Sequence, residues 1–127
     1  MTIESLKFIN NKLDENNINY EFMQWTKDIV YPYFVGEYQE SEPLFEDGMK
    51  EATFILTGFS KGSWFELEQT KEKIEKIFSN ATVILPNGNG LAVFYSGSLV
   101  IPTGDAELKR IQINLAIKEW MVNINNG

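Results

Sequence analysis

The stretch most suggestive of chemistry is Gly58-Phe59-Ser60-Lys61-Gly62, between a strand-like run and the start of a helix. A G-x-S-x-G pattern in that setting is typical of the nucleophile elbow of serine hydrolases. Such a serine needs a base, normally an imidazole, to take its proton. The chain contains no histidine, and Lys61 would have to lose its charge to serve instead. We therefore expect the two glycines to permit a turn, and we expect no catalytic residue and no enzyme.

Cysteine is absent as well. Its absence excludes disulfides, thiolate catalysis and cysteine-ligated metal sites, and the lack of histidine excludes the commonest zinc sites. Paired carboxylates, as in glycosidases, remain available. The segment 37–47 holds several carboxylates, but all are local in sequence, which is typical of a solvated acidic loop. We expect no metal and no cofactor, and an acid–base hydrolase stays as an alternative.

Length and charge limit the class of protein further. The 127 residues, 43% of them hydrophobic, predict a single domain over residues 1–127. The formal net charge of −7 is the opposite of what tight nucleic-acid binding requires. No positively flanked leader and no apolar run of about 20 residues occurs, so we expect no membrane partner.

Hydrophobic periodicity predicts two helices. The first is capped by Thr2 and stops at Asn16 and Asn17, and the second is opened by a capping box of Ser63 and Glu66. Strands are expected over residues 20–25, 30–38, 52–59, 81–85, 91–95 and 109–118.

Two of these strands carry specific expectations. Residues 52–59 form a continuous apolar run, which predicts a strand buried on both faces. Residues 109–118 alternate between apolar and polar side chains, which predicts one dry and one wet face. The element order indicates an α+β fold, with a mostly antiparallel β-sheet and two α-helices packed on one face.

Aromatic side chains are candidates for contact with a partner. Tyr31, Tyr33 and Tyr38 follow one expected strand, and Trp25 and Trp120 lie near strand ends. Packing in the core and contact with another subunit both remain open for them.

Several segments resemble a known family. They are Tyr31-Pro32-Tyr33-Phe34-Val35-Gly36-Glu37-Tyr38, Glu46-Asp47-Gly48, Thr53-Phe54-Ile55-Leu56-Thr57-Gly58, Gly62-Ser63-Trp64 and the run from Ile101-Pro102-Thr103-Gly104-Asp105 to Leu115. Together they are similar to small tail-assembly proteins of phages and prophages, in particular the tail-terminator, or head–tail joining, proteins of long-tailed bacteriophages.

The resemblance implies a structural virion-assembly protein. It implies a homo-oligomeric ring, hexameric in the tail and also able to exist as a monomer in solution. The ring would cap the tail tube and join it to the head-completion or connector protein. It implies location in the virion tail or neck after assembly in the bacterial host cytoplasm, with DNA passing through without specific binding.

An interface hypothesis follows from the resemblance. The acidic segment 37–47 and the turn at residues 86–90 are expected to reach a ring neighbour, the tube or the lumen. The corresponding interface residues are Glu37, Glu40, Glu42, Glu46, Asp47, Asn87 and Asn89. The alternatives are another neck or minor capsid protein, or a cytosolic acidic adaptor or inhibitor that binds a basic partner.

Overall fold

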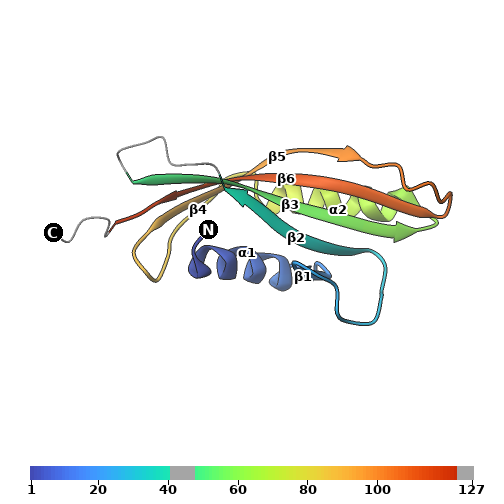
Figure 1. Cartoon of the computed structure of the whole chain (residues 1–127), viewed down its shortest axis with the longest axis horizontal. Coiled ribbons are helices and arrows are strands. Elements are labelled where there is room, and N and C mark those ends of the chain that lie inside the picture. Colours follow the sequence, from blue (N-terminus) through green and yellow to red (C-terminus); the bar gives the residue numbers. More distant parts are fainter. Residues whose placement is uncertain (41–47, 123–127) are drawn as a thin grey trace.

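Two helices and six strands make up residues 1–40 and 48–122, the part of the chain that the computed structural model describes (Figure 1). In chain order they are α1 (Ile3–Glu15), β1 (Tyr20–Phe22), β2 (Tyr33–Glu40), β3 (Met49–Lys61), α2 (Trp64–Ile77), β4 (Ala81–Ile84), β5 (Gly90–Val100) and β6 (Leu108–Trp120). The expected combination of helices and a large sheet is confirmed.

Both helices begin at the predicted caps. The Thr2 hydroxyl accepts a hydrogen bond from the Ser5 amide at 3.2 Å, which satisfies one of the free N–H groups at the start of α1. α1 ends at Asn16, and Asn17 adopts a left-handed φ of 59°, which asparagine tolerates better than most residues. Ser63 caps α2 by accepting from the Phe65 amide at 3.1 Å. The helix predictions are confirmed.

The strands form one sheet in the order β1-β2-β3-β6-β5-β4. The expected antiparallel arrangement holds for β2–β3, β3–β6, β6–β5 and β5–β4, whereas β1 runs parallel to β2. β1 is shorter than expected because the chain leaves the sheet after Phe22. The expected strand at residues 91–95 continues in β5 to Val100, beyond an irregularity between Tyr95 and Ser98.

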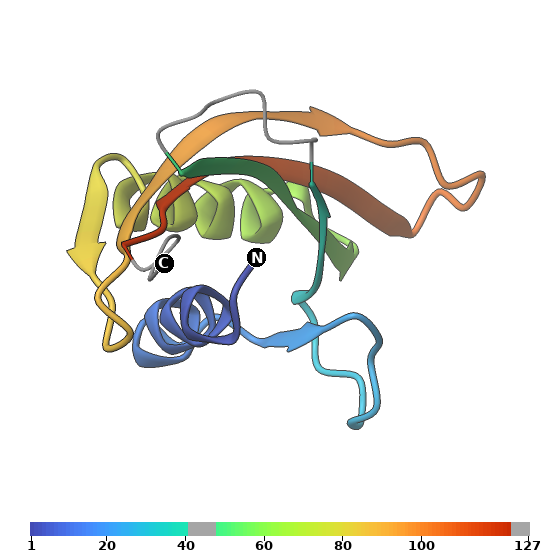
Figure 2. The same ribbon diagram turned by 60° about the vertical axis from the view of Figure 1, so that its left-hand side comes forward.

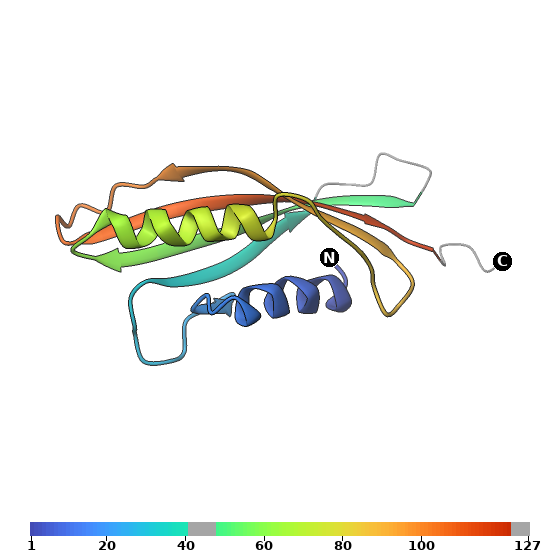
Figure 3. The ribbon, with the colours of Figure 1, turned by 180° about the vertical axis from the view of Figure 1, so that it is seen from behind.

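The sheet curls, and both helices lie within its curve (Figure 2). α2 runs lengthwise along the central strands, in front of them in the view of Figure 3, and it contacts β3 and β6. α1 lies lower in the curve and contacts β1. Side chains from both helices and from the inner face of the sheet form one core, which includes Leu13, Leu67, Phe34, Phe54 and Ile113.

The two strand expectations had different outcomes. In β6 the residues Ile111, Ile113, Leu115 and Ile117 are buried and alternate with half-buried residues, as predicted. The prediction that β3 is buried on both faces is wrong. Phe54 and Leu56 are buried, but the alternate residues Ile55 and Thr57 are half-buried, because both helices cover the inner face.

Candidate interaction surfaces

The glycines and serine of the Gly58–Gly62 stretch have structural roles. Gly58 lies opposite Phe34 in the β2–β3 register, and a Cβ built on Gly58 would lie 2.2 Å from the Phe34 ring. Gly58 therefore makes room for a core aromatic ring within β3 and does not form a turn, contrary to expectation. Gly62 has a φ of 88° and does form the turn into α2.

Ser60 is completely buried on the inner face of β3. Its hydroxyl donates to the Glu66 carboxylate, 2.9 Å away on the first turn of α2. The predicted capping box is therefore half confirmed: Ser63 caps the helix, whereas Glu66 binds the Ser60 side chain. This bond fixes the start of α2 against the end of β3.

Four of the predicted interface residues, Glu37, Glu40, Asn87 and Asn89, lie within the described residues. Glu37 is exposed on β2, and Glu40 ends that strand in an ion pair with the Met1 ammonium group. Glu42, Glu46 and Asp47 lie outside the described residues. Asn87 is exposed in the β4–β5 turn, where its side-chain oxygen accepts a hydrogen bond from the backbone amide of Asn89 at 3.0 Å.

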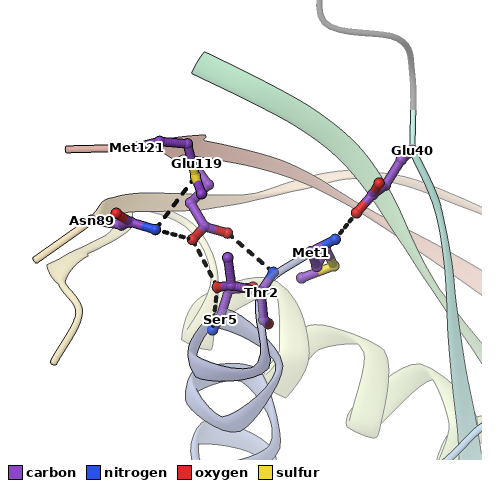
Figure 4. A network of polar contacts seen from close by, with 7 residues as sticks. All are labelled: Met1, Thr2, Ser5, Glu40, Asn89, Glu119 and Met121. Carbon is purple, nitrogen blue, oxygen red and sulfur yellow. Dashed lines mark hydrogen bonds and ion pairs between the residues drawn. The ribbon is translucent and has the colours of Figure 1, made fainter. Parts of the chain in front are cut away.

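Asn89 is only 5% exposed and belongs to a buried polar network around Glu119 (Figure 4). Its side-chain amide donates to Glu119 at 2.8 Å, and the Thr2 hydroxyl donates to the same carboxylate oxygen at 2.7 Å. The amide of Val122 donates to the Asn89 side chain at 3.2 Å. In the described chain Asn89 is therefore part of an internal network, and its side chain is not presented to a neighbour.

This network joins three distant parts of the chain: the start of α1, the β4–β5 turn and the end of β6. Glu119 is 4% exposed, and such a carboxylate is stable only when it is hydrogen-bonded. Burial lowers the pKa of the neighbouring Met1 ammonium group, while the charge of Glu119 acts in the opposite direction. A cavity of about 120 Å³ beside Glu119 is smaller than the roughly 300 Å³ typical of small-molecule sites.

Sequence reasoning missed Glu119, although a signal was present. The period-two pattern of buried residues in β6, continued two residues beyond Ile117, places Glu119 on the dry face. A charged residue at a dry position indicates a buried partner, and here that partner is Asn89.

The aromatic residues that the sequence left open mainly contact one another. Tyr33 stands between Trp25 and Phe59, with ring centroids 4.7 and 5.0 Å away, and Tyr31 adds a third contact at 5.7 Å. All four are half-buried. Burial, with a smaller effect of Tyr31, raises the pKa of Tyr33. Trp120 differs from this group because it is exposed at the end of β6.

The β1 side of the sheet carries an exposed apolar segment, residues 23–32, which we call the apolar connection. Met23 is 63% exposed and Val30 is 64% exposed, and Ile29 between them is also exposed. Internal bonds hold this connection: the Glu21 carboxylate accepts from the Thr26 amide and hydroxyl, both at 2.7 Å, and the Asn19 side chain donates to the Val30 carbonyl.

The β4 side of the sheet carries an open groove of about 580 Å³, which we call the neutral groove. Every residue that lines it is uncharged. Ile84, which is 72% exposed, and the exposed Trp120 belong to its walls, together with Thr82, Phe94 and Leu91.

Neither a metal site nor a membrane-spanning helix is found in residues 1–40 and 48–122. No group of three or more acidic, histidine or cysteine residues is placed there to hold an ion. No helix in these ranges has both the length and the apolar character needed to cross a bilayer.

Comparison with known proteins adds no family assignment: the chain matches no protein-family profile and no curated protein sequence.

Proposed function

We propose that this chain is a structural virion-assembly subunit of the tail-terminator type. In this proposal the subunits close into a ring on the end of a tail tube and join the tube to the head connector. They act by shape and docking alone. The proposal takes its protein class from the sequence resemblance. The structural observation that carries it is the presence of two unlike exposed apolar surfaces on opposite sides of the sheet.

A ring requires two unlike surfaces on each subunit. In head-to-tail association, one surface of a subunit binds a different surface of the next, and the chain of contacts closes when the rotation allows it. The apolar connection follows β1, and the neutral groove lies beside β4, which are the two outermost strands of the sheet. Exposed apolar residues at both positions support this mode of association.

The charge of the chain supports the proposed passage of DNA. A ring of subunits that each carry −7 would repel phosphate groups over roughly 10 Å at moderate salt, so DNA would pass without being held. The proposed partners are other copies of this chain, the tail-tube protein and the head connector. The proposed location is the virion tail, after assembly in the bacterial host cytoplasm.

Electron microscopy of the purified protein tests the proposal. We expect negatively stained particles to be rings, and native mass spectrometry to give one closed oligomer, with six copies as the expected number. Both measurements are repeated at the highest attainable protein concentration and in the presence of tail-tube protein, because a terminator can remain monomeric until it meets a tube. A protein that stays monomeric or dimeric under all these conditions contradicts the proposal and favours the adaptor alternative.

A further inference from the structure

The β4–β5 region has an unusual charge distribution. No lysine, arginine, aspartate or glutamate occurs between Lys76 and Asp105, although charged residues make up 23% of the chain. This stretch contains all of β4 and β5 and the turn between them. The two strands at this edge of the sheet, β4 and β5, are thus free of charge in a strongly acidic protein.

An uncharged side has a physical consequence for self-association. Copies that each carry −7 repel one another, and charged side chains are depleted in the buried centre of protein interfaces. Sheets that avoid edge-to-edge contact usually protect the outer strand with charges, especially lysine. β4 is the outer strand on this side and has no such protection.

The apolar connection on the opposite side has matching properties. Its side chains at Met23, Ile29 and Val30 are exposed, and its two charged residues, Lys27 and Asp28, balance each other. Met23 adopts a left-handed φ of 73°, which is strained for a residue with a long side chain. The Glu21 bonds hold the backbone that follows Met23, which reduces the backbone entropy lost on binding.

We infer that the neutral groove of one copy receives the apolar connection of a second copy of this chain. The contact is head-to-tail, because the two surfaces are unlike and lie beside β1 and β4, the outermost strands at opposite edges of the sheet. Ile29 and Val30 of one copy lie against Ile84 and Trp120 of the next. The inference rests on the proposed function for the closure of these contacts into a ring, but not for the contact itself.

Disulfide trapping tests this pairing directly, because the natural chain contains no cysteine. The double variant Val30→Cys/Ile84→Cys is oxidised with diamide and run on a non-reducing gel. We expect a ladder of covalent multimers, whereas Val30→Cys and Ile84→Cys alone stay monomeric. Trapping accumulates even a weakly populated contact, since each disulfide formed is retained.

The matched control is Val30→Cys/Glu75→Cys, because Glu75 is exposed on α2 and belongs neither to the neutral groove nor to the apolar connection. It is expected to give no ladder. Absence of a ladder from the Val30→Cys/Ile84→Cys variant overturns the inference. A strong dimer from Ile84→Cys alone also overturns it, since two neutral grooves would then face each other.

Charge insertion tests the groove without oxidation. Thr82→Glu places a charge in the neutral groove, and Gln69→Glu adds the same charge on the exposed face of α2. We expect Thr82→Glu to weaken self-association by at least about tenfold in analytical ultracentrifugation, because the added charge would lose its hydration when the contact forms. Gln69→Glu should leave it within about twofold. Equal effects of the two variants would count against the groove.

Met23→Gly tests the apolar connection without threatening the fold. Glycine adopts a positive φ freely, so the thermal unfolding midpoint should stay the same or rise. Self-association should fall, because the exposed side chain is removed. Unchanged self-association contradicts the role given to Met23.

These outcomes separate the inference from the proposed function. Rings in the microscope without a disulfide ladder would leave the ring function standing and refute the pairing. A ladder from a protein that forms only open chains would support the pairing and refute the terminator function.

Discussion

The two halves of the sheet are stabilised in different ways. The β1–β2–β3 half and its connection hold every close pair of aromatic rings found among the described residues, from Tyr20–Phe54 to Tyr33–Phe59. The β6–β5–β4 half is mainly aliphatic and is joined to α1 by the polar network around Glu119. The first half is stabilised by close packing of aromatic rings, and the second by hydrogen bonds to one buried carboxylate. Different substitutions should therefore destabilise the two halves.

Glycines show the difference most clearly. In the first half, a Cβ on Gly36 would lie 2.6 Å from Tyr20, and one on Gly58 would lie 2.2 Å from Phe34. In the second half, a Cβ on Gly90 would lie 3.7 Å from Trp120, an ordinary contact. The glycines inside β2 and β3 thus have no spare space, whereas those inside β5, Gly90 and Gly97, do.

The largest effect is expected from Gly58→Ala. The added methyl group would force the Phe34 ring out of its position in the core, which should lower the free energy of unfolding by about 3 kcal/mol. Urea denaturation followed by circular dichroism measures this value. The matched control is Gly90→Ala, which should change stability by less than about 0.5 kcal/mol. Similar losses in both variants would remove the distinction between the halves.

Glu119→Ala should have the next largest effect, in the other half. The substitution leaves the Asn89 amide and the Thr2 hydroxyl without their acceptor, at a cost of about 2 kcal/mol. Amide hydrogen exchange should speed up at Asn89 and Val122 before it does so in β3. Glu37→Ala, at an exposed position, is the control and should stay within about 0.5 kcal/mol of the natural protein. An unchanged free energy of unfolding in Glu119→Ala would show that the network adds nothing to stability.

Ser60→Ala is expected to cost less, about 1 kcal/mol, in the same denaturation assay. It removes one hydrogen bond, but the freed Glu66 carboxylate is exposed and can be solvated by water. Loss of an activity with the fold intact would instead revive the hydrolase interpretation of the Gly58–Gly62 stretch.

The smallest effect concerns pH and the apolar connection. Hydrogen bonds from Thr26, followed by the amide of Lys27, lower the pKa of Glu21 below its ordinary value of 4.5. The stability added by these bonds is therefore present above pH 4.5 and is lost as pH falls through the lower pKa of the folded state. An NMR titration should show the depressed pKa, and Thr26→Ala should raise it toward 4.5. A pKa of Glu21 that stays at 4.5 in the natural protein would contradict the hydrogen bonds from Thr26 and Lys27.

Patterns along the chain predicted what depends on local neighbours. Thr2 and Ser63 identified both helix starts, and the alternation of Ile111, Ile113 and Leu115 identified the dry face of β6. These features arise within a few residues, where backbone geometry and hydrophobic period act together.

Features that depend on pairing across the chain were not predicted. The role of Gly58 follows from Phe34, which the sheet places beside it, and the parallel direction of β1 follows from where the chain re-enters at Tyr33. The interface hypothesis includes Asn89 because it belongs to the turn at residues 86–90, whereas the hydrogen bond to Glu119 keeps its side chain inside the protein. No local pattern contains that partner. The interface hypothesis for Glu37, Glu40 and Asn87 remains a prediction.

The position of β6 has a consequence for how the protein is made. This strand lies between β3 and β5 and pairs with both, yet it follows them in the chain. During translation, β3 and β5 cannot pair with β6 until residues 108–120 have left the ribosome. Until then, apolar residues such as Phe54 and Leu56 lack part of their cover, and the nascent chain is most open to aggregation or chaperone capture.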